Sequence, residues 1–323
     1  MRRIVCEAWG PPESLVLVDE DDPVAGPGRV VVAVTAAGVN FVDALFVAGT
    51  YQIKVPPPFT PGSELVGRVV EVADDVTSVG VGDRVLTSMG LGGWSSHVVV
   101  RASALTTVPD ALDDAVAAAL VQSYSTAWFT LTRRIALAAG ETVLVLGAGG
   151  GVGLAAIDVA RSLGATVIAA ASTPEKLADA VAMGATSTIS YESADLKAEA
   201  RALSGGGVDV VIDPVGGPFT EPALRALGFG GRLAVIGFAA GGIASLPVNQ
   251  VLLNNRSVVG VDWGAWAMKN PADQAVLFAE VLAAVADGRL HPPRPSQHPL
   301  ADAGAVLRGL LDRKLRGKAV LVP

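Results

Sequence analysis

The strongest structural signal in the chain is ETVLVLGAGGGVG, from Glu141 to Gly153. The apolar residues Val143 to Leu146 predict a buried strand, which leads into a glycine-rich turn. The apolar stretch from Val152 to Ala160 predicts a helix after the turn. Glycine lets the backbone approach a pyrophosphate, and a helix N-terminus offers free N–H groups to it. The glycine spacing that fits is Ala148-x-Gly150-x-x-Gly153, with alanine in the first slot. The turn therefore predicts a dinucleotide site, although many glycine-rich turns are only tight corners.

Strands and helices alternate on both sides of this turn. Strands are predicted at residues 143–146, 166–171, 187–190, 208–212, 231–237 and 257–261. Helices are predicted between them at residues 153–163, 175–183, 196–203 and 220–226. Thr173-Pro174-Glu175 is a helix start, because a hydroxyl can cap the helix and proline suits its first position. This order predicts a doubly wound parallel six-stranded sheet of the Rossmann type, so the fold class is α/β.

The first 115 or so residues have a different texture. Short valine-rich strands are predicted at residues 29–37, 64–73, 83–87 and 96–100, separated by glycine and proline clusters. This pattern is typical of a partly open β-barrel. A helix is predicted over residues 115–131, and two more over 273–287 and 301–312, before a last strand at 319–322. We expect that strand to return to the barrel domain, which then comprises 1–118 and 264–323, with the Rossmann domain 119–263 inserted.

Composition excludes several classes of function. The net charge of −7 argues against a basic surface for nucleic acid or an anionic membrane. The single cysteine, Cys6, excludes a disulfide framework and a thiolate metal site within one chain. Residues 233–255 lack charge, but Pro247 and several glycines make them a poor membrane span. Glu7 interrupts any signal-like apolar run, so a cytoplasmic protein is expected.

A series of motifs then extends over almost the whole chain. They are GVNFVDALFVAGTY (38–51), PFTPGSELVGRVVEV (58–72), VGDRV (81–85), GGWSSHVVV (92–100), YSTAWFTL (124–131), GAGGGVG (147–153), ASTPEKL (171–177), VDVVIDPVGG (208–217), GRLAVIGF (231–238) and GKAVLV (317–322). In this combination and order the chain resembles the zinc-independent quinone oxidoreductase branch of the medium-chain dehydrogenase/reductases, which includes zeta-crystallin-like NADPH:quinone reductases. The resemblance implies a GroES-like barrel domain beside the Rossmann domain. It is much less specific for the substrate.

The resemblance also implies that the enzyme uses no metal. In zinc alcohol dehydrogenases a zinc-binding cysteine precedes the aspartate by three positions, and a zinc-binding histidine lies just before a glutamate. Here these positions hold Asn40, before Asp43, and Ser63, before Glu64. The four-cysteine structural zinc lobe is absent, and the scattered His97, His291 and His298 lack the spacing of ligands.

The end of the second Rossmann strand indicates which dinucleotide binds. An NAD site usually places a carboxylate there, about 20 residues past the glycines. This strand ends Ala170-Ala171-Ser172-Thr173 without one, and Lys176 follows within a turn. A 2′-phosphate needs donors and positive charge, so NADPH is the expected cofactor. Against this stands Glu175, which could point inward, although a carboxylate in a first helical turn ordinarily faces solvent.

The resemblance assigns the cofactor contacts by position. The 2′-phosphate is expected near Ser172, Lys176, Tyr191 and Arg313, the pyrophosphate near Gly150, Gly151 and Val152, and the nicotinamide near Thr126, Gly237 and Phe238. Two of these residues have a plainer alternative. Arg313 could belong to a solvated helix end, and Thr126 could be an ordinary helix hydroxyl bonded to a carbonyl.

Hydride transfer to a quinone or an enone builds negative charge on an oxygen, which hydrogen-bond donors must stabilise without a metal. The predicted catalytic residues are Asn40, whose amide N–H groups can donate, Tyr51, whose phenol can donate a proton, and Asp43. Asp43 is expected to orient its neighbours, on the assumption that its carboxyl is exposed and ionised. Asn40 could instead be a turn residue, and Tyr51 could be an aromatic packed beside Phe46.

Aromatic residues are scarce, and some of them could wall an apolar substrate pocket. The candidates are Phe41, Trp94, Trp263 and Trp266. A tryptophan in a core or in a dimer interface is the equal alternative. By resemblance, the sixth Rossmann strand, with Val258 to Val261, pairs with that of a second copy, so a homodimer is expected.

The leading interpretation is an NADPH-dependent, metal-free reductase of quinones or α,β-unsaturated carbonyls. The alternative within the same chemistry is a reductase of enoyl thioesters or 2-alkenals. A different class also stays open: a nucleotide-binding member of the branch with a structural or RNA-binding role. The acidic balance and the lack of basic runs count against RNA.

Overall fold

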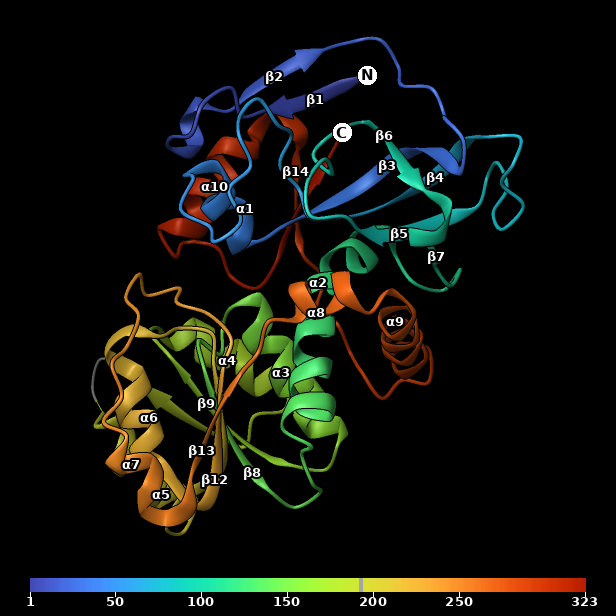
Figure 1. The fold of residues 1–323 in the computed structure, drawn as a ribbon. Coiled ribbons are helices and arrows are strands. Elements are labelled where there is room, and N and C mark those ends of the chain that lie inside the picture. The colour runs from blue at the N-terminus through green and yellow to red at the C-terminus, as the bar shows by residue number, and fades with distance from the viewer. Residues whose placement is uncertain (192–193) are drawn as a thin grey trace. The chain divides into compact units, whose positions relative to one another are not determined.

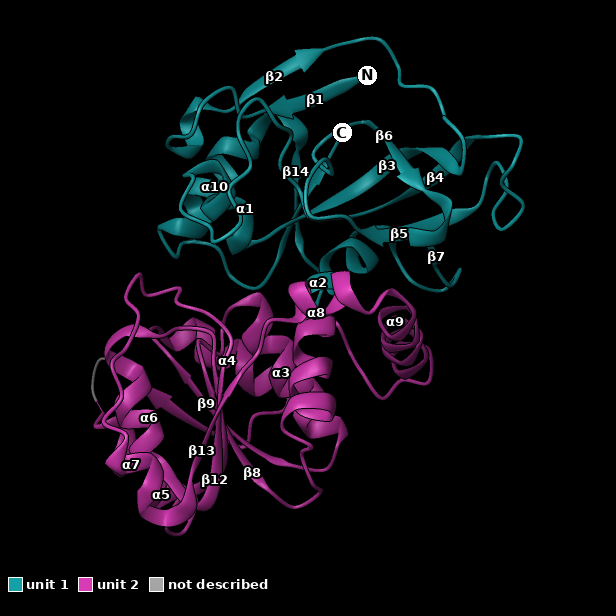
Figure 2. Ribbon diagram, viewed as in Figure 1, with its two compact units in different colours: residues 1–122, 293–323 teal, residues 123–292 magenta. Residues whose placement is uncertain are grey.

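The computed structural model describes residues 1–191 and 194–323. The chain divides into two compact units (Figure 2). Unit 1 comprises residues 1–122 and 293–323, and unit 2 comprises residues 123–292. Among the described residues, no helix combines the length and the apolar character needed to cross a membrane.

Unit 2 is built on a six-stranded sheet in the order β10-β9-β8-β11-β12-β13. Its strands are β8 (Thr142–Leu146), β9 (Thr166–Ala171), β10 (Ser187–Ser190), β11 (Val208–Asp213), β12 (Leu227–Val235) and β13 (Ser257–Gly260). All neighbouring pairs are parallel, which confirms the predicted Rossmann sheet. Val143 to Leu146 are fully buried, as expected of a central strand covered on both faces.

Helices lie on both sides of this sheet (Figure 1). Those next to its strands are α3 (Gly151–Ser162), α4 (Pro174–Ala182), α5 (Leu196–Leu203) and α6 (Thr220–Ala226). Unit 2 also contains α7 (Asn249–Leu252), α8 (Trp263–Lys269) and α9 (Pro271–Ala286), a π-helical segment η3 (Phe129–Arg134) and the 3-10 turns η4 (Gly217–Phe219) and η5 (Leu253–Asn255). α4 begins as predicted: the Thr173 hydroxyl accepts from the Lys176 backbone N–H at 3.4 Å, and Pro174 takes the first position.

Unit 1 contains a seven-stranded sheet, ordered β14-β15-β3-β4-β5-β7 with β6 paired to β3, and a separate hairpin of β1 and β2. The strands are β1 (Arg2–Val5), β2 (Val16–Asp19), β3 (Arg29–Val39), β4 (Glu64–Val72), β5 (Arg84–Ser88), β6 (His97–Arg101), β7 (Thr106–Thr107), β14 (Ser296–Pro299) and β15 (Ala319–Val322). The helices are α1 (Phe41–Val47), α10 (Ala303–Leu311) and the 3-10 turns η1 (Pro12–Ser14), η2 (Ala102–Ala104) and η6 (Leu300–Asp302). α2 (Asp114–Trp128) carries the chain from unit 1 into unit 2.

The last strand joins the N-terminal residues, as the sequence predicts. β15 pairs antiparallel with β3, and Ala319 lies opposite Val39. Residues from the two ends of unit 1, about 280 positions apart in the sequence, therefore become neighbours. This pairing places residue 318 beside residue 40.

The boundary of the inserted unit differs from the predicted one. Residues 264–292, expected in the barrel domain, belong to unit 2. The reason is the packing of α8 and α9. Trp128 donates to Glu280 on α9 at 2.7 Å, and Trp263 donates to Gln274 at 2.8 Å. These contacts hold α9 against its own unit.

Candidate functional site

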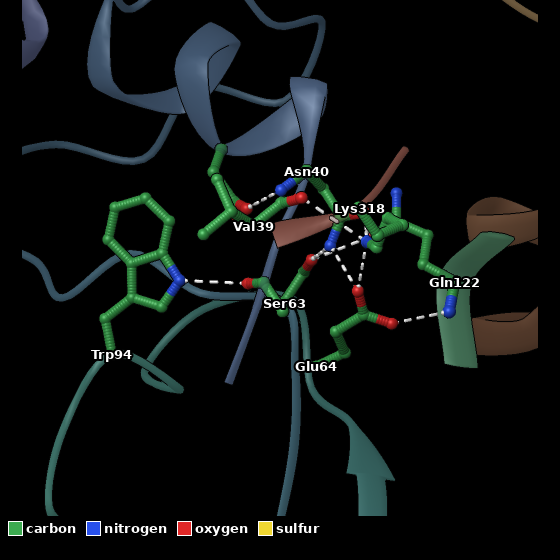
Figure 3. Close-up of polar contacts among 9 residues, drawn as sticks. Val39, Asn40, Ser63, Glu64, Trp94, Gln122 and Lys318 are labelled. Atoms are coloured by element: carbon green, nitrogen blue, oxygen red, sulfur yellow. Dashed lines mark hydrogen bonds and ion pairs between the residues drawn. The ribbon is translucent and has the colours of Figure 1, made fainter. Parts of the chain in front are cut away.

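The polar site of unit 1 is centred on Glu64, the first residue of β4, which is fully buried (Figure 3). Its Oε1 accepts from Lys318 Nζ at 2.6 Å and from Asn40 Nδ2 at 2.7 Å. Its Oε2 accepts from the backbone N–H of Gln122 at 2.6 Å. Gly38 makes this approach possible, because a Cβ there would lie 2.1 Å from Glu64 Oε1. One buried carboxylate therefore links β3, α2 and the segment before β15.

Lys318 is the cation that compensates this buried carboxylate. Its side chain is only 10% exposed and contacts Glu64 Oε1, Asn40 Oδ1 at 2.5 Å and the carbonyl of Val39 at 3.3 Å. An ammonium has three hydrogens, so these three acceptors use all of them. A buried charge pair is stable only when its remaining hydrogen bonds are satisfied, and here they are.

Asn40 takes up the position between the two charges. Its Oδ1 accepts from Lys318, while its Nδ2 donates to Glu64 and to Ser63 Oγ, the latter at 3.2 Å. Both hydrogens of the amide are thus engaged within the protein. Its backbone N–H donates to Asp43 Oδ2 at 2.8 Å and forms the capping box of α1. The structure brings together Asn40, Asp43 and Ser63, as their positions predict.

The assumption that Asp43 is exposed is wrong. The side chain has no exposed surface, and its Oδ1 has no partner among the described residues. Burial raises the pKa of Asp43 to about 7, against the opposing effects of the Asn40 backbone hydrogen bond and the charge of Lys318. A carboxyl with such a pKa is about half protonated near neutral pH. The predicted orienting role agrees with its bond to the Asn40 backbone.

Gln122 was not anticipated as a site residue. It lies on α2, where its side-chain Oε1 accepts from Ser63 Oγ at 2.8 Å. The available signal was weak: one amide side chain that directly follows the apolar run of residues 115–121. Only the fold brings that amide next to Ser63, 59 positions away.

The remaining predicted residues of unit 1 have different settings. Tyr51 is half-buried, and its ring lies 4.7 Å from that of Phe46, which is the packed arrangement considered above. Trp94 has no exposed surface and donates to the carbonyl of Gly38 at 3.0 Å. A side chain buried in this way belongs to the core of unit 1 and does not wall an open pocket. Phe41 is half-buried at the start of α1.

The glycine turn of unit 2 has the backbone shape that a pyrophosphate requires. Gly147 has φ +60°, and Gly150 is the N-cap of α3 with no side-chain cap. The first N–H groups of α3, those of Gly151 and Val152 among them, therefore have no helical acceptor. A Cβ at Gly153 would lie 2.3 Å from the carbonyl of Gly147, so only glycine lets the helix approach the turn.

Lys176 lies directly against this turn. A Cβ at Gly149 would come within 2.5 Å of Lys176 Cβ, so the lysine stem lies over the glycine. Tyr191 also contacts the turn. Its hydroxyl accepts a hydrogen bond from the Gly147 backbone N–H at 2.7 Å, and its ring centroid lies 4.3 Å from that of Phe219. These residues fit a phosphorylated dinucleotide, because a cation and a hydroxyl lie beside a turn that leads into the first N–H groups of α3.

The surroundings of the 2′-phosphate position also agree with the prediction. β9 ends at Ala171 with no carboxylate, and Ser172 is half-buried. Glu175 is exposed, so of the two settings considered for its carboxylate, inward or facing solvent, the structure shows the second. Arg313 is exposed after α10 in unit 1 with φ +60°, at the helix end. Its contact with the phosphate stays a prediction.

At the expected nicotinamide end, the loop after β11 is held by a residue that sequence reasoning missed. Asp213 is buried and accepts from the backbone N–H groups of Val215 and Gly216 at 2.9 and 2.8 Å. A Cβ at Gly216 would meet the Phe238 ring at 2.8 Å, so this loop packs against the predicted pair Gly237 and Phe238.

Thr126 is buried, and its carbonyl accepts from Thr130 Oγ1 at 2.6 Å. Trp263 is nearly buried in unit 2 beside Phe278, with ring centroids 6.4 Å apart, and Trp266 packs on Phe129. The core alternative therefore describes Trp263, whereas Trp266 is half-buried. Over residues 1–191 and 194–323, no group of three or more His, Cys, Asp or Glu side chains could hold a metal.

Comparison with known proteins agrees with this geometry. The family described as alcohol dehydrogenase GroES-like domain matches residues 26–110, and the one described as zinc-binding dehydrogenase matches residues 151–279. Quinone oxidoreductase-like protein 2 of Bos taurus is 40% identical over 297 residues, which cover 91% of this chain and 85% of that protein.

A solved quinone oxidoreductase from Thermus thermophilus, described with its NADPH complex, is 36% identical, with a TM-score of 0.87 and full coverage of both chains. A mycocerosic acid synthase-like polyketide synthase of Mycobacterium tuberculosis is 33% identical over 92% of this chain, but that match covers only 14% of the synthase. The protein is therefore a member of the quinone oxidoreductase branch of the medium-chain dehydrogenase/reductase family.

Proposed function

We propose that this protein is an NADPH-dependent reductase that transfers hydride to a quinone or an α,β-unsaturated carbonyl without a metal. The observation that carries the cofactor assignment is the contact of Lys176 with Gly149 of the phosphate-binding turn. The absence of a carboxylate at the end of β9 supports the same assignment. The similar quinone oxidoreductases support the substrate class.

The residues of unit 2 have the binding role. The first-turn N–H groups of α3 would hold the pyrophosphate, and Lys176, Ser172 and the Tyr191 hydroxyl would surround the 2′-phosphate. When bound, NADPH would supply the hydride. Thr126, Gly237 and Phe238 are proposed to line the nicotinamide end.

The residues of unit 1 have the chemical role. An oxygen that gains negative charge needs donors. In place of metal ligands the site has Asn40 and Ser63, whose side-chain hydrogens are engaged within unit 1, and Gln122, whose amide nitrogen can still donate. Tyr51 is proposed to deliver the final proton to reduced enones, while hydroquinones can take theirs from water. Asp43 positions Asn40 through its backbone N–H.

Steady-state oxidation of NADPH against 1,4-benzoquinone, a 2-alkenal and crotonyl-CoA tests the proposal. We expect the highest turnover with the quinone, and NADPH preferred over NADH. A wild-type enzyme that binds NADPH but reduces none of the three compounds would refute the catalytic part.

The second candidate is a reductase of enoyl thioesters or 2-alkenals. The similarity to a segment of a polyketide synthase supports it. The same three compounds distinguish the two candidate functions. The second candidate requires crotonyl-CoA or the alkenal, and not the quinone, to be the best substrate. We also propose a homodimer through β13, the edge strand of the unit 2 sheet, where Val258 is 42% exposed.

A further inference from the structure

The side chains around Glu64 form a directed series of hydrogen bonds, which we call the polar chain: Lys318, Asn40, Ser63 and Gln122. Lys318 Nζ donates to Asn40 Oδ1, Asn40 Nδ2 donates to Ser63 Oγ, and Ser63 Oγ donates to Gln122 Oε1. The distances are 2.5, 3.2 and 2.8 Å. Figure 3 shows these residues converging from four separate segments of unit 1.

Chemistry fixes the direction of every bond in the polar chain. An ammonium can only donate, so the Asn40 oxygen must face Lys318. A carboxylate can only accept, so the Asn40 nitrogen must face Glu64, and its second hydrogen goes to Ser63. Ser63 has one proton, and because its oxygen already accepts from Asn40, that proton goes to Gln122 Oε1. The Gln122 amide is therefore oriented with its nitrogen away from Ser63.

The polar chain ends in an unused donor. No acceptor among residues 1–191 and 194–323 pairs with Gln122 Nε2, and this atom is not sealed from solvent, since it is absent from the buried unpartnered atoms. Every other donor hydrogen in the polar chain has an acceptor inside unit 1. Gln122 thus carries, in its side-chain NH2 group, the donor hydrogens of the polar chain that have no acceptor among the described residues.

We propose that Gln122 Nε2 donates the hydrogen bond that binds the substrate carbonyl oxygen, and that Lys318 polarises this donor through Asn40 and Ser63. The inference rests on the proposed reduction of a quinone or an enone and assigns its oxygen-binding group. Each amide in the polar chain accepts at its oxygen, which makes its own N–H more acidic, and a charged donor at the start strengthens every bond that follows. Asn40 then acts as a positioning residue, because both of its amide hydrogens are already engaged.

The test compares two substitutions of Gln122 with a matched control. Gln122→Met keeps the length of the side chain but removes the donor, and Gln122→Glu keeps the acceptor for Ser63 while removing the donor. Because one donor to a charge-developing oxygen contributes about 10²-fold to turnover, each variant should lose about that much in kcat/KM for the quinone or enone. NADPH affinity, measured by fluorescence titration, should not change. Gln297→Met, at an exposed position of β14, should behave as wild type.

A second measurement needs no turnover. The carbonyl stretching frequency of 2-cyclohexenone bound to the NADP⁺ complex should be lowered in the wild type, because a hydrogen bond weakens the C=O bond. The frequency should return towards its free value in Gln122→Met. Ser63→Ala interrupts the polar chain without removing a charge or the Gln122 donor, so it should give an intermediate frequency. Thr87→Val removes another buried hydroxyl of unit 1, which bonds to the Ala104 carbonyl, and should leave the frequency unchanged.

The outcomes distinguish a failure of the proposed function from a failure of the role assigned to Gln122. A wild type that reduces no quinone and no enone refutes the proposed function and this inference with it. A wild type that is active, with both Gln122 variants within about twofold of it in kcat/KM and unchanged in carbonyl frequency, refutes the role of Gln122 alone.

Discussion

At the scale of single residues, the site depends on two carboxyls buried in opposite ways. Glu64 is surrounded by donors, namely Lys318, Asn40 and the Gln122 backbone. Asp43 has one strong donor and an oxygen without a partner among the described residues. Desolvation therefore dominates at Asp43 and raises its pKa, whereas Glu64 is held by a buried cation.

The Lys318–Glu64 pair leads to a prediction about stability. Lys318→Met leaves a carboxylate buried without its counter-charge, so it should lower the free energy of unfolding by about 3 kcal/mol. The double variant Lys318→Met with Glu64→Gln removes both charges and should recover much of the loss. Urea unfolding followed by tryptophan fluorescence measures both changes. Equal losses in the single and double variants would show that the pair does not act as a unit.

Asp43 leads to a prediction about pH. Its pKa of about 7 in the folded protein lies above the value of about 3.9 in an unfolded chain. The folded state holds the proton more tightly, so this carboxyl's contribution to stability is complete below about pH 4 and is lost as the pH rises through about 7. The amide of Asp43→Asn does not titrate, so the variant does not show this loss. Its free energy of unfolding relative to that of the wild type should therefore rise by about 2 kcal/mol when the pH is raised from 5 to 8.

The measurement for Asp43 is urea unfolding of both proteins at the two pH values. Asp74→Asn, which makes the same change at an exposed position of unit 1, is the matched control. If the difference in free energy of unfolding between Asp43→Asn and the wild type does not grow with pH, the raised pKa of the buried Asp43 carboxyl is contradicted.

At the scale of elements, the β8–turn–α3 segment and the start of α4 form one binding element. Lys176 lies in the first turn of α4, and its stem covers Gly149. A charge-assisted hydrogen bond contributes about 1.5–3 kcal/mol, so Lys176→Ala should weaken NADPH binding at least about tenfold and leave NADH binding nearly unchanged. Lys197→Ala, on the exposed face of α5, is the matched control. Fluorescence titration with both nucleotides checks this; equal losses for NADPH and NADH would contradict a contact with the 2′-phosphate.

Elements could be predicted from the sequence where the information is local. The glycine turn, the Thr173 cap and the valine-rich strands depend on neighbours within a few positions, and all of them are confirmed. The polar chain depends on pairs such as Glu64 and Lys318, which are 254 positions apart, so no local pattern marks it. The burial of Asp43 was missed for the same reason, and the choice between core and pocket for Trp94 stayed open, because a packed neighbourhood is assembled by the fold and is not written in a motif.

At the scale of the whole molecule, the exposed edge strand β13 is the proposed site of contact with a second copy of the chain. β13 has a neighbouring strand on one side only, and Val258, which is 42% exposed, lies on it. Val258→Lys should place a charge in the proposed interface and convert a dimer to a monomer. Light scattering coupled to size exclusion measures the mass; a monomeric wild type, or a dimeric Val258→Lys, would refute the β13 interface. Val81→Lys, at an exposed position of unit 1, is the control.

The insertion of unit 2 between the two parts of unit 1 also sets an order of events during synthesis. Residues 1–122 leave the ribosome first, but the strand that completes their sheet, β15, and the cation for Glu64 follow only after all of unit 2. Unit 2 contains its six-stranded sheet within residues 123–292 and can finish folding while residues 37–39 of β3 still lack the strand that pairs with them. A nascent chain stopped before residue 318 should therefore hold a formed nucleotide-binding unit beside an unfinished barrel. The emergence of one lysine then completes the site.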